Sequence, residues 1–335
     1  MTGLVHIADP TDSSGTASRQ PGKRSRVKTG RMVFFAVLTV GFLVLAALRL
    51  FGVEGSRITS ALIALTPYWT AGGLLVGAVA LGFRHWWIGG VALVVAIVLV
   101  AMVLPRAFTS ARPEAHGTKL RIMSSNQYLG RADVKAVVQL VRDNQVDVLN
   151  LLELTPREVR EFESAGLFEL LPYRVFKPVS GANGSGIASR YPLTELSLVG
   201  PGEMEQPSAR IEVGGTPVEI VAAHPVAPVA SAATWKSDLA RLPRPDSGGA
   251  VRILAGDFNA TLDHAAFRDL LDAGYVDAGE NRGEGFAPTW PSGYFPPPVT
   301  IDHVLVDPRV AVDGYRVFDV PDSDHNAVFA EVTLP

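Results

Sequence analysis

The sequence contains no cysteine among its 335 residues. This absence excludes disulfide bonds, zinc sites built on thiolates, and catalysis by a cysteine nucleophile. It does not decide on which side of a membrane the chain works, because a chain without thiols suits either redox compartment. Any catalytic or metal-binding chemistry must therefore use oxygen and nitrogen groups.

Acidic residues are few in the first third of the chain, and basic residues are outnumbered in the rest. Residues 1–112 contain 11 Lys and Arg against 3 Asp and Glu, whereas residues 113–335 contain 19 against 30. The second part also has no run of basic residues, and binding to a nucleic acid duplex depends on neutralising many phosphates. Two different environments are indicated, and nucleic acid is not an expected partner of the acidic part.

Three long apolar runs lack Asp, Glu and Lys altogether: MVFFAVLTVGFLVLAALRLF (32–51), roughly 60–82, and 86–104. A bilayer-spanning helix needs ~20 apolar residues. The alternatives are a signal peptide for the first run, whose apolar core is usually only ~7–15 residues, and buried soluble helices for the others. We expect three spans, and their lack of acidic residues and Lys disfavours a transporter or proton relay.

Basic residues directly before the first run predict its orientation: Arg19, Lys23, Arg24, Arg26, Lys28 and Arg31. Such residues stay cytoplasmic, so three crossings would place everything after Arg106 outside the cytoplasm. Arg49 lies one turn from the outer end of the first run, where its head could reach the interface. Pro67 and the pair Gly72–Gly73 predict a kink or close helix packing in the second run.

The pattern predicts four regions: a disordered basic cytoplasmic tail (1–31), three transmembrane helices (32–106), a linker (107–118) and a catalytic domain (119–335). In the last region, apolar runs bounded by turn residues alternate with helical periodicity, which indicates one α/β domain with mixed sheets covered by helices. Strands are predicted at 119–126, 146–154, 186–190, 208–213, 217–224, 251–258, 301–307 and 325–334, and helices at 131–145, 156–165, 229–242 and 263–272.

Polar residues recur at the ends of these predicted strands: Asn126, Glu153, His224, Asp257, Asn259, Asp302, Asp324 and His325. Each alone has an ordinary explanation, such as an Asx turn or a hydrogen-bonded structural histidine. Together they indicate a site, because converging carboxylates repel one another unless a cation lies among them. Oxygen ligands without a His-x-x-x-His pattern favour Mg²⁺ or Mn²⁺ over zinc.

The ordered series SSNQ, LLELT, GSGIASRYPL, AAHP, GDFNAT, TIDHVLV and SDHNAVF resembles the endonuclease/exonuclease/phosphatase superfamily. That superfamily includes DNase I, abasic-site endonucleases, inositol polyphosphate 5-phosphatases and neutral sphingomyelinases. The resemblance spans residues 118–335 and implies a four-layer α/β sandwich of the DNase I type.

Carried over by position, the resemblance implies that Glu153 is the main Mg²⁺ ligand, with Asn126 beside it and Asp324 near the metal. Asp257 and Asn259 would orient the attacking water and the scissile phosphate. His325, paired with Asp302, would contact the phosphate as base or as stabiliser of charge, and His224 would assist the leaving group. Arg190 is a further substrate-binding candidate that could instead hold a loop.

One fold hosts nucleases, sugar phosphatases and lipid hydrolases, so the substrate must be argued separately. Confinement to a membrane surface and the acidic domain favour a small or lipid-borne phosphate. The aromatic loop GFAPTWPSGYFPPPVTID (285–302) could enter the headgroup layer or cap the core.

The layout is similar to actinobacterial membrane proteins of the teicoplanin-resistance VanJ type, which implies an undecaprenyl-type phosphate or pyrophosphate outside the cell and a link to glycopeptide resistance. A tethered extracellular nuclease, a sphingomyelinase-like phosphodiesterase and a non-catalytic interaction module are the alternatives.

Overall fold

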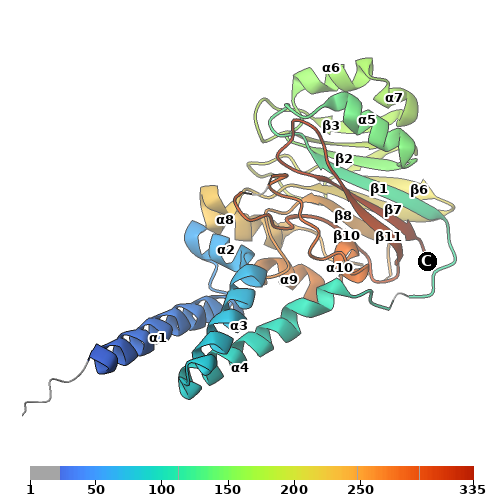
Figure 1. Cartoon of the computed structure of the whole chain (residues 1–335). Coiled ribbons are helices and arrows are strands. Elements are labelled where there is room, and N and C mark those ends of the chain that lie inside the picture. The colour runs from blue at the N-terminus through green and yellow to red at the C-terminus, as the bar shows by residue number, and fades with distance from the viewer. Residues whose placement is uncertain (1–22, 112, 247, 294) are drawn as a thin grey trace, which may run out of the picture.

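A computed structural model describes residues 23–335 except 112, 247 and 294. The described chain has two parts, a group of apolar N-terminal helices and an α/β domain that stands on them (Figure 1).

The α/β domain contains two six-stranded mixed sheets. In the first, the central strands β1 and β2 are parallel and the outer pairings are antiparallel. Its order is β11 (Ala311–Phe318), β12 (Ala327–Thr333), β1 (Lys119–Asn126), β2 (Val148–Leu152), β4 (Ser185–Ser189) and β3 (Tyr173–Lys177). The parallel pair brings the carboxyl ends of β1 and β2 to the same edge of the sheet.

The second sheet repeats this arrangement around the parallel pair β7 and β8. Its order is β5 (Thr194–Leu196), β6 (Ser208–Val213), β7 (Thr216–Ala223), β8 (Val251–Asp257), β10 (Asp302–Val306) and β9 (Val276–Asp277). Gly256 is required in β8, because a Cβ there would lie 1.9 Å from the Ala223 carbonyl oxygen of β7.

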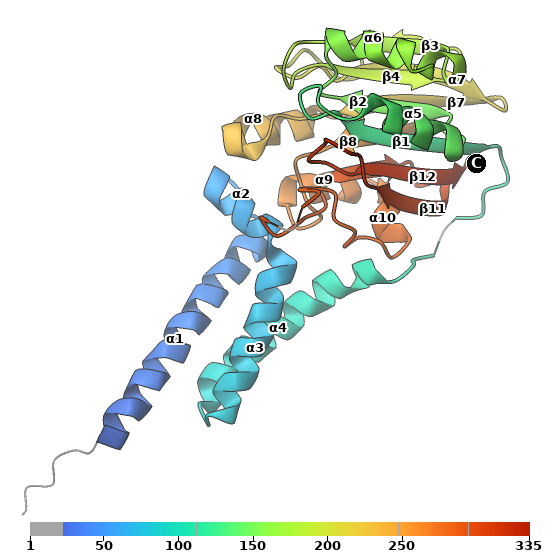
Figure 2. The same cartoon turned by 45° about the horizontal axis from the view of Figure 1, so that its top comes forward.

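Helices cover the outer faces of both sheets, so the domain has four layers (Figure 2). The first sheet is covered by α5 (Val134–Asp143), α6 (Pro156–Ser164) and α7 (Leu167–Leu170), and the second by α8 (Pro228–Arg241) and α9 (Ala265–Asp272); α10 (Ala278–Asn281) follows β9. An apolar core of alternate strand residues fills the space between the sheets. Within it the Asn150 amide donates to the carbonyls of Val221 and Ala255, which links the two sheets.

The predicted α/β sandwich is therefore confirmed, and each predicted strand and helix overlaps an observed one. The strands β3, β5, β9 and β11 were not predicted. Thr155 caps α6 through a capping box, in which the Glu158 side chain accepts from the Thr155 amide.

The N-terminal part consists of α1 (Lys23–Leu50), α2 (Arg57–Ala64), α3 (Thr66–Gly82), α4 (Trp86–Val103) and the 3₁₀ turn η1 (Leu104–Ala107). Two helical stretches, Arg26–Leu50 and Trp86–Ala107, are long and apolar enough to cross a membrane. The bent pair α2 and α3 would make a third if counted as one span.

Two predictions about these helices need correction. The disordered tail was predicted to extend to residue 31, but α1 already begins at Lys23, since Lys and Arg are good helix formers; residues 1–22 lie outside the described residues. The predicted second span is broken between α2 and α3 by a 68° bend. The break directly precedes Pro67, which lies in the first turn of α3. Proline lacks a backbone N–H and its ring clashes with the preceding turn of a helix, so the predicted kink is confirmed.

Arg49 does not reach out to a membrane interface, which corrects a further prediction. It is 3% exposed, and its Nε donates to Asp263 Oδ1 over 2.7 Å. Arg106 donates to both Asp263 oxygens, at 2.8 and 2.9 Å. The three residues form a buried ion cluster, called here the Asp263 cluster, that joins α1 and η1 to the α/β domain.

A second junction lies beside this cluster. Both carboxylate oxygens of Glu54 accept from the first backbone amides of α9, at Ala265 and Ala266. A carboxylate at a helix N-terminus satisfies amides that have no partner within the helix and matches the helix dipole. The helical part is thus held to the sandwich by buried polar contacts as well as by the chain itself.

Candidate active site

Two buried aspartates face each other where β8 ends and β10 begins. Asp257 and Asp302 are opposite residues of this antiparallel pair, and each is 2% exposed. Like charges directly across a ladder destabilise it. His325, at the end of the loop before β12, lies against both: its Nδ1 is 2.9 Å from Asp302 Oδ2 and its Nε2 is 3.7 Å from Asp257 Oδ2.

The three groups change one another's protonation. Burial, together with the charge of Asp302, raises the pKa of Asp257. Burial lowers the pKa of His325, but Asp302 and Asp257 outweigh it and raise the pKa well above the ordinary value for histidine. The imidazolium form of His325 is therefore the favoured form at neutral pH in this triad.

The carboxyl ends of β1 and β2 bring Asn126 and Glu153 to the same place. Asn126 Nδ2 lies 3.3 Å from Glu153 Oε1 and 3.2 Å from Asp257 Oδ2, so this amide bridges residues of the two sheets. Glu153 Oε2 accepts from the Leu129 amide over 2.6 Å. Burial raises the pKa of Glu153, and this amide contact opposes the shift.

Left-handed backbone recurs at these positions. Glu153 has a φ of 57° and Asn259 a φ of 49°, and Tyr128 and Leu129 in the loop after β1 share the conformation. Outside glycine such backbone is uncommon, and it concentrates at functional sites. Here it turns the side chains of Glu153 and Asn259 at the points where their strands have just ended.

His224 and Asn259 also lie beside Asp257. His224 Nε2 is 4.0 Å from Asp257 Oδ2, and the Asn259 amide donates to Asp257 Oδ1 over 2.8 Å. Asn259 Nδ2 donates to the Pro225 carbonyl, next to His224. Burial and the charge of His325 lower the pKa of His224 to about 3, so this imidazole is neutral at pH 7.

Asp324 lies at the rim of the site, with a side chain 35% exposed. Its Oδ1 is 4.0 Å from His325 Nε2, and its Oδ2 accepts from Trp290 Nε1 over 3.2 Å. Ser323 Oγ donates to the Asn126 carbonyl, which ties this loop to the end of β1. All eight predicted strand-end residues therefore lie in one place, although they come from both sheets.

Arg190 is the exception among the predicted site residues, and its assignment is corrected. It follows β4, which runs antiparallel to β2, so it lies beside Asp147 at the start of β2. Glu153 follows the other end of β2, a strand of five residues and ~17 Å. Arg190 Nη1 lies 3.4 Å from Asp147 Oδ1, which is a structural role.

Two residues of the site were not identified from the sequence. Thr289 Oγ1 accepts from the backbone amides of Ile301 and Asp302, which fixes the start of β10. Trp290 was noted only as part of the aromatic loop, yet it bonds Asp324 and its ring lies 6.4 Å from that of His325. The position of Trp290 in a loop twelve residues before Asp302 could have indicated its place in the site, whereas no feature of the sequence indicated Thr289.

A metal fits the oxygen ligands at this point. Asn126, the partly buried carboxylate of Glu153 and the buried carboxylate of Asp257 offer hard ligands side by side, and a divalent cation would favour the charged forms of both acids. Ligand atoms of Asp257, Asp302 and His325 also lie within 4.8 Å of one another. His325 is already hydrogen-bonded to Asp302. We therefore propose that Asp257, Asp302 and His325 contact the proton and the phosphate, and that the metal lies beside Asn126 and Glu153.

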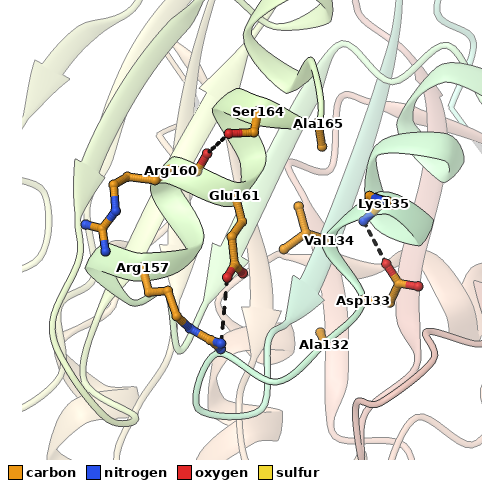
Figure 3. Close-up of a pocket in the computed structure, with 9 residues that line it drawn as sticks. All are labelled: Ala132, Asp133, Val134, Lys135, Arg157, Arg160, Glu161, Ser164 and Ala165. Atoms are coloured by element: carbon orange, nitrogen blue, oxygen red, sulfur yellow. Dashed lines mark hydrogen bonds and ion pairs between the residues drawn. The ribbon is translucent and has the colours of Figure 1, made fainter.

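The cavity shown in Figure 3 is a different place. It has a volume of about 580 Å³ and lies between α5 and α6 on the outer face of the first sheet. None of the predicted site residues lines it. Its charged side chains include the pair Arg157 and Glu161, separated by 3.7 Å.

Comparison with known proteins agrees with this geometry. Residues 123–325 match the Endonuclease/Exonuclease/phosphatase family model. A comparison with curated protein sequences gives no significant match.

Among solved structures, an endonuclease/exonuclease/phosphatase from Beutenbergia cavernae aligns with a TM-score of 0.50 and 20% identity, over 64% of this chain and 72% of that one. TDP2 of D. rerio complexed with a single-strand DNA product gives 0.51 and 19%, over 64% and 99%. An AP endonuclease from Archaeoglobus fulgidus gives 0.51 and 17%, over 63% and 98%. At these identities the likeness shows the fold.

Proposed function

Since the chain belongs to the endonuclease/exonuclease/phosphatase family, whose members are hydrolases of phosphoester bonds, we propose that it is a membrane-anchored, metal-dependent phosphatase or pyrophosphatase. Its substrate is a lipid-borne phosphate of the undecaprenyl type, outside the cytoplasmic membrane. The observation that carries the proposal is the placement of Asp257 within 3.2 to 4.0 Å of Asn126, His325 and His224.

In this proposal Glu153 and Asn126 hold a Mg²⁺ or Mn²⁺ ion, with Asp324 near it. When bound, the ion neutralises charge on the phosphoryl oxygens. The remaining polar side chains position the water, the phosphate and the leaving oxygen for in-line hydrolysis.

Asp257 is placed to orient the attacking water and take its proton, because its raised pKa suits a base at neutral pH. Asn259 is held by its own contacts to Asp257 and Pro225 and presents an amide to the phosphate. His325, kept cationic and oriented by Asp302, stabilises the negative charge on the phosphoryl oxygens. His224 is neutral, so it donates a hydrogen bond to the leaving oxygen.

The lipid substrate is supported by the rest of the chain. Two or three helices can span a membrane, and the basic residues before residue 32 favour a cytoplasmic N-terminus. An acidic domain without basic runs suits a single phosphate better than a nucleic acid. The similarity to the VanJ type favours a lipid of peptidoglycan synthesis and a role in glycopeptide resistance.

Removal of divalent metal should abolish hydrolysis, and Mg²⁺ should restore it. Glu153→Gln should raise the Mg²⁺ concentration needed for half-maximal activity by about tenfold or more, because a neutral amide replaces the main anionic ligand. The measurement is phosphate release during Mg²⁺ titration after EDTA treatment. Glu158→Gln is the control, since burial raises the pKa of Glu158 as it does that of Glu153, but Glu158 only caps α6. Equal shifts in both variants would contradict the assignment.

The substrate can be tested directly. The purified full chain in detergent is incubated separately with undecaprenyl pyrophosphate, plasmid DNA and sphingomyelin, with and without EDTA. We expect inorganic phosphate from the prenyl lipid alone, and none from Asp257→Ala or His325→Ala. Cleavage of DNA alone would identify a tethered nuclease, and release of a phosphorylated headgroup would identify a sphingomyelinase-like enzyme; either would overturn the proposed substrate.

A further inference from the structure

Two neighbouring cavities connect the apolar helices with the α/β domain. One, of about 360 Å³, lies between the start of α3 and residues 261–263, 285–286 and 298–300. The other, of about 160 Å³, lies between α3 and α4. Pro67, Ala71 and Phe286 line both, so the two cavities adjoin, and together they are called here the α3 groove.

The upper end of the α3 groove approaches the active site. Thr261 and Thr300 line it, and each lies two residues from a candidate catalytic residue, Asn259 and Asp302 respectively. The intervening segments are held together by the Phe258 amide, which donates to the Ile301 carbonyl over 2.9 Å. Two residues of extended chain span ~7 Å, so the groove ends close to the proposed phosphate position.

The open surface of the groove is suited to hydrocarbon. At the lower end the lining comes from apolar positions of α3 and α4, including Leu74 and Val100. At the upper end, polar side chains already bond to the protein: Tyr68 Oη donates to the Pro298 carbonyl and Thr300 Oγ1 to the Ala287 carbonyl. Arg106 is likewise engaged with Asp263. A polar headgroup would find few partners here.

We infer that the α3 groove holds the part of a lipid's hydrocarbon chain that adjoins its phosphate, so that the lipid enters the active site from the side of the membrane helices. The inference rests on the proposed function, which places these helices in a bilayer. The occupant is a single long chain, because the two adjoining cavities follow one another from α4 to the loops that carry Thr261 and Thr300. The upper cavity alone lies within the volume range of small-ligand pockets.

The test fills the groove at the residue where its two halves meet. Ala71 is exposed on α3, so Ala71→Trp adds a side chain to the groove without entering a packed core. Ala78→Trp is the matched control, since Ala78 is exposed on the same helix and lines neither cavity. We expect Ala71→Trp to lower kcat/KM for undecaprenyl pyrophosphate about tenfold or more, chiefly through KM, and to leave hydrolysis of soluble dimethylallyl pyrophosphate unchanged.

A second readout does not depend on turnover. The probe is a long-chain prenyl phosphate in liposomes that carries a diazirine on the isoprene unit nearest the phosphate. It should label α3 and residues 285–300. Ala71→Trp should remove this label, and Ala78→Trp should keep it. Labelling elsewhere, or an equal loss of both activities in Ala71→Trp, would overturn the groove assignment. Labelling of the groove without lipid hydrolysis would instead overturn the proposed function.

Discussion

His325→Asn should lower kcat for phosphate release by about a thousandfold, at the upper end of the range of roughly 10²–10³ found when one donor that stabilises developing charge is removed. The reason is geometric, because His325 lies between Asp302 and Asp257. In the proposed mechanism its cationic ring donates a hydrogen bond to the phosphate beside the attacking water. Steady-state kinetics with saturating Mg²⁺ measure the effect, and thermal unfolding shows whether the variant is folded.

His303, which follows Asp302 in β10, supplies the control for this prediction. His303, like the Asp302–His325 pair, makes a buried bond to an aspartate: its Nδ1 lies 2.8 Å from Asp277 Oδ2. It points to the opposite face of β10, among Phe258 and Phe267. His303→Asn should therefore reduce stability and leave kcat per folded molecule nearly unchanged. A comparable loss of kcat in both variants would show that His325 acts only by supporting the fold.

Asp263→Ala should destabilise the protein by roughly 3–5 kcal/mol, because it leaves the guanidinium groups of Arg49 and Arg106 buried without their counter-charge. The measurement is the midpoint of unfolding in detergent. Glu195→Ala, which removes the carboxylate bound by exposed Lys177, should cost less than about 1 kcal/mol. If both substitutions had the same small effect, the Asp263 cluster would not hold the two parts together.

The Asp263 cluster also predicts a pH dependence. Burial alone would raise the pKa of Asp263, but Arg106 and Arg49 outweigh burial and lower it. A carboxyl group whose folded pKa lies below its unfolded pKa stabilises the fold above the unfolded value, ~3.9 for Asp. This stability is lost as the pH falls through the folded pKa. The difference in stability between the protein and Asp263→Ala should therefore shrink below about pH 4.

The ends of the central strands β2, β7 and β8 were predictable, because the apolar stretches 151–152, 220–223 and 253–256 each stop at a polar residue. Edge strands were not. In β3 only Val175 is buried, and in β11 the register shifts between Val312 and Gly314, so neither shows a regular pattern.

Long-range pairing set the other limit. Arg49 and Asp263 are 214 positions apart, and nothing in either local sequence names the other as a partner. Arg190 lies in a family-like stretch, yet the antiparallel direction of β4 carries it to the opposite end of β2 from Glu153. The list of strand-end residues could thus be read from the sequence, whereas the direction of each strand decided which residues meet.

The double attachment of the α/β domain limits how far its active site can travel. A catalytic domain on a free linker would sweep a wide volume and meet dissolved molecules from any direction. Here Arg49 of α1 and Arg106 of η1 both bind Asp263, and Glu54 binds the first amides of α9 beside them. If the helices lie in a bilayer, the catalytic residues stay at one height above it, and encounters depend on two-dimensional diffusion of molecules within the leaflet.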